Sequence, residues 1–118
     1  MAKHNQKVGR WGEQAAADFL SSRGYEIIAR NVRTPYGEID LVAQRGGAIV
    51  FVEVKARTTK QFGLPEQAIT NRKAEHLSAA AEYYAVEHDL TSWQIDAVSV
   101  EGNPGGEPRI THFENVVF

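Results

Sequence analysis

In the segment GEIDLVAQRGGAIVFVEVKAR, which runs from Gly37 to Arg57, four charged residues lie within the two apolar, β-branched runs 38–44 and 48–56. They are Glu38, Asp40, Glu53 and Lys55. Charged side chains are rarely buried in such a segment unless they are paired or bind a metal. Two carboxylates are the usual protein ligands of Mg²⁺, and a lysine beside them could stabilise a charged phosphate. The segment therefore predicts metal-assisted chemistry on a phosphate group.

The same segment predicts how these residues face one another. Gly46-Gly47 separates two strand-like runs, residues 38–44 and 48–56, which indicates a two-residue hairpin loop. Such a loop sets the facing pairs, which are Val42 with Phe51, Asp40 with Glu53, and Glu38 with Lys55. Because side chains alternate between faces, all six would share one face, unless an odd loop or a bulge shifts the register.

Two opposed carboxylates destabilise a sheet, because their Cβ atoms lie only ~5 Å apart. A divalent cation between Asp40 and Glu53 would remove this repulsion, and Lys55 would add positive charge beside the metal. The alternative is a salt-bridged strand end, in which Glu38 or Glu53 pairs with Lys55 and Asp40 is solvated. That arrangement leaves the repulsion between Asp40 and Glu53 unexplained.

The hydrophobic periodicity predicts the elements that would hold these residues. Helices are expected at 8–22, which Gly24 would end, and at 65–88, with a break near Thr70. Strands are expected at 25–33, 38–44, 48–56, 93–101 and 109–113. The order αβββαβ, with this last strand added, predicts a single α/β domain over residues 1–118. Its mixed sheet would join an antiparallel meander to a parallel neighbour through a helical crossover.

Composition limits the class of protein. The chain of 118 residues has no cysteine, so disulfides and thiolate metal sites are excluded and a reducing compartment is permitted. Its N-terminal residues are polar and basic, and no run approaches the ~18 apolar residues of a membrane span. We expect a soluble, cytoplasmic protein with no membrane partner. His4, His76, His88 and His112 show no ligand spacing, so they are expected at the surface, and a hydrolase triad is not expected.

Positive charge gathers around the candidate site. Residues 30–73 hold eight Lys and Arg against four Asp and Glu, whereas residues 74–118 hold one against eight. A basic surround that encloses a small acidic cluster suits the handling of a phosphate backbone together with a metal. Unevenly distributed, solvated charge is the plain alternative.

Asp40 and the run Glu53-Val54-Lys55 resemble the PD-(D/E)xK nuclease superfamily, which has the restriction-endonuclease-like fold; Ile39 stands where the superfamily name has proline. Within it, the chain resembles the YraN-like bacterial family. This resemblance runs through GRWGEQAAADFL, GYEIIARNVRTPYGEIDLVA, IVFVEVKAR, FGLPEQAITNRK and the final Phe118. The chain is also similar to the archaeal Holliday junction resolvases, which place a first-helix glutamate beside the acids. Glu13 matches that glutamate.

The resemblance implies a nuclease that hydrolyses phosphodiester bonds in DNA, including branched or junction DNA, with Mg²⁺ or Mn²⁺. It implies metal ligands at Asp40, at Glu53, at the carbonyl of Val54 and at Glu13, and a catalytic role for Lys55. A glutamate in the first turns of a helix is also common as a solvated residue. Cutting two strands symmetrically would suit a homodimer.

Basic and polar residues of the middle third are the candidate DNA contacts: Arg33, Arg57, Lys60, Gln67 and Lys73. Lys73 lies on the apolar stripe of its expected helix, either as a stem that snorkels to solvent or aimed, with Gln67, at the scissile phosphate. Two other classes stay open. One is a nucleic-acid-binding module that kept the fold and lost turnover, and the other is a structural interaction protein with an acidic C-terminal third.

Overall fold

The computed structural model describes the backbone of residues 2–58 and 71–116 and the side chains of residues 6–58 and 75–116. Its elements follow the predicted α/β order: α1 (Ala2–Ser22), β1 (Glu26–Thr34), β2 (Gly37–Arg45), β3 (Ala48–Arg57), α2 (Asn71–Glu87), β4 (Trp93–Glu101) and β5 (Arg109–Phe113). The predicted strands agree with these bounds to within one residue at either end. The first helix begins six residues earlier than predicted, and the predicted helical residues 65–70 lie outside the described part.

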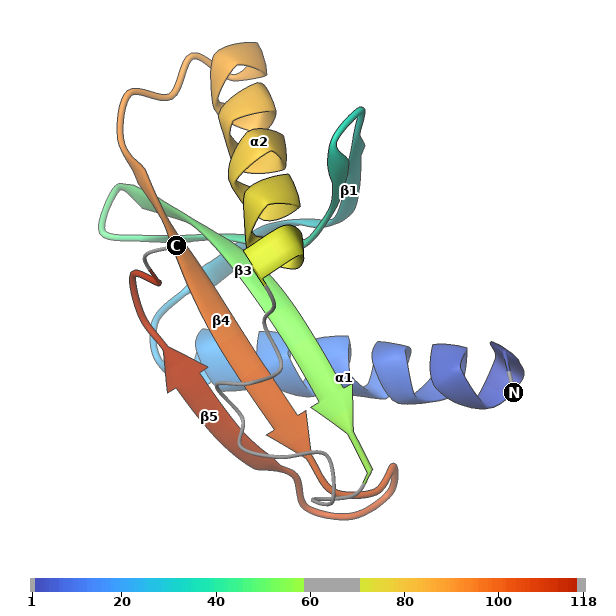
Figure 1. Cartoon of the computed structure of the whole chain (residues 1–118). Helices are drawn as coiled ribbons and strands as arrows, with labels where there is room; N and C mark the ends of the chain where they lie inside the picture. Colours follow the sequence, from blue (N-terminus) through green and yellow to red (C-terminus); the bar gives the residue numbers. More distant parts are fainter. Residues whose placement is uncertain (1, 59–70, 117–118) are drawn as a thin grey trace.

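All five strands form one mixed sheet in the order β1-β2-β3-β4-β5 (Figure 1). The first three strands are an antiparallel meander, and β4 lies parallel to β3 after the crossover that contains α2. The last strand, β5, adds to β4 in the antiparallel sense. The predicted meander and helical crossover are therefore confirmed.

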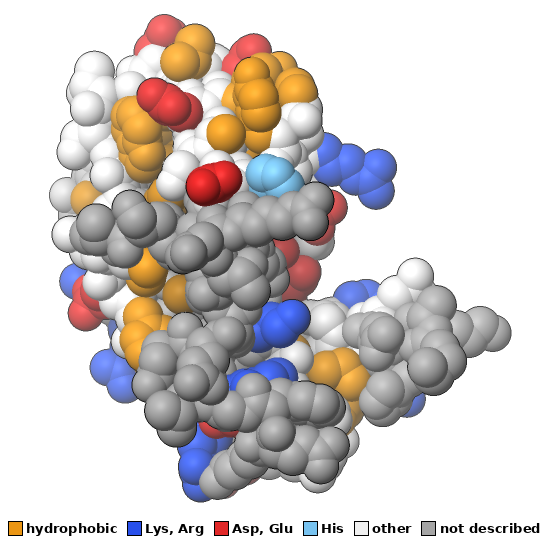
Figure 2. Space-filling view, viewed as in Figure 1, with side chains coloured by type: hydrophobic (Ala, Val, Ile, Leu, Met, Phe, Trp, Pro, Cys, Tyr) orange, Lys and Arg blue, Asp and Glu red, His pale blue; other side chains and the backbone are white. Residues whose placement is uncertain are grey.

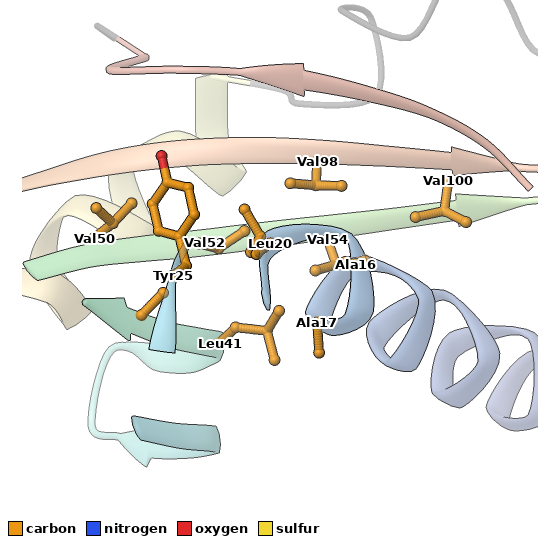
Figure 3. Close-up of a cluster of buried hydrophobic side chains, with 11 residues drawn as sticks. Ala16, Ala17, Leu20, Tyr25, Leu41, Val50, Val52, Val54, Val98 and Val100 are labelled. Atoms are coloured by element: carbon orange, nitrogen blue, oxygen red, sulfur yellow. The ribbon is translucent and has the colours of Figure 1, made fainter. Parts of the chain in front are cut away.

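Each helix covers one face of this sheet. The buried side of α1, with Ala16 and Leu20, packs on Val52, Val98 and their neighbours, and Figure 3 shows these side chains meeting at the sheet. On the other face, α2 packs a second cluster, which contains Ile39, Val42, Ile49, Phe51, Leu77, Ala80 and Ala81. Residues that alternate along β3 thus belong to opposite clusters, as a strand buried on both faces requires.

One expected surface residue is internal. The Nε2 atom of His112 lies 2.7 Å from Oδ2 of Asp96, a fully buried carboxylate. Asp96 also accepts hydrogen bonds from the side chain of Gln94 and the backbone amide of Asn115, each 2.8 Å long. The surface prediction for His112 is wrong, because a five-residue strand gives too short a pattern to show which side chains turn inward.

His76 and His88 are exposed, as predicted, whereas the side chain of His4 lies outside the described residues. Among the described residues, neither helix has the length and hydropathy required to cross a membrane.

Candidate metal centre

The site begins where β2 and β3 part. Their backbone pairing runs from Arg45–Ala48 through Val42–Phe51 to Leu41–Val52, which confirms the predicted register of the hairpin. Next along the strands, Oδ2 of Asp40 accepts a hydrogen bond of 2.8 Å from the backbone amide of Val54. A carboxylate thus takes the place of a carbonyl in the ladder, and Figure 1 shows the two strands diverging from their shared turn.

The prediction that the ladder continues to the pairs Asp40–Glu53 and Glu38–Lys55 is therefore wrong. The reason is a break in alternation: Ile39 and Val42, three residues apart, both pack in the cluster under α2. The neighbouring strand is distorted at the same level, since Asn31 has a left-handed φ of 51° between two residues that pair with β2. Asparagine tolerates this conformation better than most residues.

Three carboxylates meet where β2 and β3 separate beyond the pair Leu41–Val52, a place called the fork from here on. One oxygen each of Glu13, Glu38 and Asp40 lies within 4.8 Å of the other two, a spacing that one cation could bridge. They come from α1 and from the start of β2. Sequence reasoning placed Glu13 and Asp40 at the metal but left Glu38 out, although its position two residues before Asp40 was a usable signal.

A close approach between α1 and β3 sets the position of Glu13. A Cβ built on Gly12 would lie 2.4 Å from the Cβ of Ala56, so only glycine allows the helix to lie this near the strand. The side chain of Arg30 in β1 adds a bond of 2.9 Å to Gln14 on the same helix. Glu13 is thereby held at the fork by its own neighbours in the chain.

The electrostatics of Glu13 show how dense the negative charge is. Burial raises the pKa of its carboxyl, and the carboxylates of Glu38 and Glu53 raise it further. A hydrogen bond with the Asn31 side chain and the charge of Arg30 oppose this shift without cancelling it. Three acids around Glu13 and a raised pKa are what a cation would relieve, so the donor set suits a hard divalent metal.

Glu53 is buried on β3 and lies within electrostatic reach of Glu13, although it is not part of the three-carboxylate group. Lys55, two residues further on, is partly buried on the same side of β3. Among the described ion pairs, Glu38 lies 3.9 Å from Arg33 rather than pairing with Lys55. Of the salt-bridge alternative, the Glu38–Lys55 pair is therefore not among the described ion pairs.

The candidate DNA contacts separate into two groups. Arg33 projects into solvent, with 91% of its side chain exposed. Arg57 is buried and lies 3.2 Å from Glu101 on β4, with side-chain exposures of 7% and 8%. This burial favours a structural role for Arg57. The side chains of Lys60, Gln67 and Lys73 lie outside the described residues.

Replacing Glu13 with glutamine is expected to stabilise the metal-free protein near neutral pH. The folded-state pKa of Glu13 is raised above 4.5, so the folded protein favours the protonated, neutral carboxyl. The stability that this preference contributes is fully present below pH 4.5 and is lost as the pH rises through the raised pKa. Glutamine stays neutral and does not lose it. Denaturant unfolding in EDTA from about pH 4 to pH 8 measures the difference. It should vanish at the acid end and grow with pH, whereas parallel stability curves would show that Glu13 is unperturbed.

Comparison with known proteins places the chain in a family. Residues 12–100 match the Uncharacterised protein family UPF0102. A UPF0102 protein of Symbiobacterium thermophilum is 45% identical over 94% of this chain and 96% of its own length. A second, from Neisseria meningitidis, is 46% identical over 84% and 88% of the two chains. These matches confirm the YraN-like resemblance, and the chain belongs to the Uncharacterised protein family UPF0102.

Proposed function

We propose that this protein is a nuclease that hydrolyses phosphodiester bonds in DNA with Mg²⁺ or Mn²⁺. The observation that carries the proposal is the fork between β2 and β3, where Asp40 replaces a backbone partner and meets Glu13 and Glu38. Like charges gathered on two elements destabilise a fold. A site for a cation gives this arrangement a use that a structural role does not.

Asp40, Glu13 and Glu38 would hold the metal, with Glu53 and the carbonyl of Val54 close by on β3. A divalent ion bound there supplies a water of lowered pKa and positive charge for the phosphoryl oxygens. The hydrogen bond from the Val54 amide fixes the carboxylate of Asp40, so this ligand does not have to be ordered when the metal binds. The third carboxylate, Glu38, extends the ligand set beyond the residues that the motif names.

Lys55 would act on the phosphate. It lies two residues beyond Glu53 on the same side of β3, and its ammonium can stabilise the charge that builds on the phosphoryl oxygens in the transition state. Arg33, which is exposed beside Glu38, would contact the neighbouring backbone phosphate. Arg57 is left out of this footprint because its guanidinium is buried against Glu101.

The resemblance of Asp40, Glu53 and Lys55 to the PD-(D/E)xK motif supports the same proposal. It also supports the restriction-endonuclease-like fold as the fold of this nuclease. Similarity to the archaeal resolvases supports branched or junction DNA as the substrate and a homodimer as the active form. The alternative is a DNA-binding module that kept this fold without turnover. Metal binding separates the two classes, since the module has no need of the cation.

Calorimetric titration with Mn²⁺ tests the proposal. Wild type is expected to bind the ion and to gain about 2.7 kcal/mol of stability when free Mn²⁺ is 100 times its Kd. Asp40→Asn should lose most of this binding, because the amide keeps an oxygen for the Val54 amide but removes a charged ligand. Glu107→Gln, in the exposed loop between β4 and β5, is the matched control. Equal Mn²⁺ binding by Asp40→Asn and this control would contradict the site.

A further inference from the structure

Two exposed tyrosine rings contact each other edge to face, and one of them lies in the turn that leads into the strand of Glu38 and Asp40. Tyr36, in the turn between β1 and β2, is 53% exposed, and Tyr83 on α2 is 38% exposed. Their ring centroids are 6.3 Å apart at an interplanar angle of 63°. Figure 2 shows hydrophobic side chains reaching the surface over α2, above the hollow that separates this part of the molecule from α1. Exposed aromatic surface of this kind often marks a binding site.

The turn that carries Tyr36 is held in place. The hydroxyl of Thr34 donates to the carbonyl of Gly37 at 2.7 Å and accepts from the amide of Tyr36 at 3.1 Å. Gly37 has a φ of 132°, which favours glycine, and a Cβ built on it would lie 3.9 Å from the Cβ of His76 on α2, an ordinary van der Waals distance. The ring of Tyr36 is therefore presented by a fixed turn rather than by a free loop.

Tyr36 lies close in the chain to the acids and to positive charge. Tyr36 precedes Glu38 by two residues, so their α-carbons are at most ~7.6 Å apart. Arg33, on the other strand of the same hairpin, is 91% exposed. Aromatic faces, an exposed arginine and a metal-binding cluster in one place match the three parts of a nucleotide chain: base, backbone phosphate and reacting phosphate.

We propose that Tyr36 and Tyr83 form a stacking platform for an unpaired base next to the cleaved phosphate. This inference rests on the proposed nuclease function, and it names the substrate class as DNA with a single-stranded or unstacked nucleotide at the cut. Bases stack on aromatic side chains without regard to sequence, whereas paired bases in a duplex do not expose their faces. Two rings are far smaller than the ~800 Å² per partner of a standard protein interface, which favours a base over a protein as the occupant.

Binding of fluorescent DNA tests the platform. Anisotropy is measured in Ca²⁺ with a single-stranded oligothymidylate and with a blunt duplex of the same length. Tyr36→Ala and Tyr83→Ala are each expected to weaken single-strand binding about tenfold, with duplex binding changed less than about twofold. Tyr36→Phe should bind like wild type, because it keeps the ring. Val86→Ala, which removes an exposed apolar side chain one turn along α2, is the control for a general loss of hydrophobic surface.

Each outcome decides the proposal. Equal loss on both DNAs, no loss on either, or no single-strand binding by wild type would overturn it. Melting curves confirm that the alanine variants are folded. The two proposals fail separately: a protein that binds no Mn²⁺ but needs both tyrosines for single strands keeps the platform and loses the nuclease. If wild type cuts DNA but the Tyr36→Ala variant binds single strands as tightly as wild type, the nuclease proposal stands and the platform proposal fails.

Discussion

Lys55→Ala is expected to lower DNA cleavage by about 10²–10³-fold, the usual effect of removing one group that stabilises transition-state charge. Mn²⁺ binding should change little, because the proposed ligands are the carboxylates of Glu13, Glu38 and Asp40 with Glu53 close by. DNA affinity should fall only slightly, since the lysine acts more strongly on the transition state than on bound substrate. Single-turnover cleavage, calorimetry and anisotropy on the same preparation separate the three quantities.

The control for this change is Lys55→Arg, which keeps the positive charge but spreads it over a planar group. It is expected to recover part of the cleavage rate, because charge is the main contribution of Lys55. If Lys55→Ala lowered stability and metal binding as strongly as cleavage, Lys55 would be a structural partner on β3. That result would favour the salt-bridge interpretation of the strand end.

Arg57→Ala is expected to destabilise the protein by about 3–5 kcal/mol, because it leaves a buried carboxylate without its ion-pair partner. Arg57 and Glu101 lie side by side on the parallel strands β3 and β4, 3.2 Å apart and almost completely buried. Urea unfolding measures the loss. Arg33→Ala is the matched control: the same side chain is removed from a position that is 91% exposed, and stability should change by less than about 0.5 kcal/mol.

The same two variants are expected to behave oppositely toward DNA. Arg33→Ala should weaken binding and flatten its salt dependence, because a phosphate contact releases counterions. A stable, folded Arg57→Lys variant should bind DNA like wild type. If Arg57→Lys lost as much affinity as Arg33→Ala while its urea midpoint stayed unchanged, Arg57 would be a DNA contact and its burial against Glu101 would not decide its role.

The hairpin could be predicted from sequence because two local signals agree there. Gly46-Gly47 sets the turn, and apolar alternation on both sides sets the faces, so the pairs up to Val42–Phe51 followed directly. The fork could not be predicted. It depends on a carboxylate that takes a backbone amide from another strand, and on the left-handed backbone of Asn31, neither of which leaves a periodic signal. The alternation of apolar residues and the turn predict which residues of the hairpin pair, whereas the position where the pairing of β2 and β3 stops depends on tertiary contacts.

A count of charges along the chain does not show which charges pair, for a related reason. Arg57 belongs to the basic middle third and Glu101 to the acidic last third, so a tally along the chain separates two residues that the parallel pairing of β3 and β4 brings together. Glu38 was missed because the predicted ladder paired it with Lys55. The structure instead turns it toward Glu13 and Asp40. Glu38 and Asp40 are two residues apart at the start of β2, so both could have been considered as ligands of one metal.

The measurement that tests metal-dependent hydrolysis most directly is cleavage of end-labelled DNA by wild type and Asp40→Asn, side by side. Junction, flapped, single-stranded and duplex DNA are each incubated with Mg²⁺, with Mn²⁺ and with EDTA. Metal-dependent hydrolysis at the fork predicts products from at least one DNA with wild type and a metal, and none with EDTA or with Asp40→Asn. If wild type binds these DNAs but cuts none of them, or if Asp40→Asn cuts as fast as wild type, the fork is not a nuclease site.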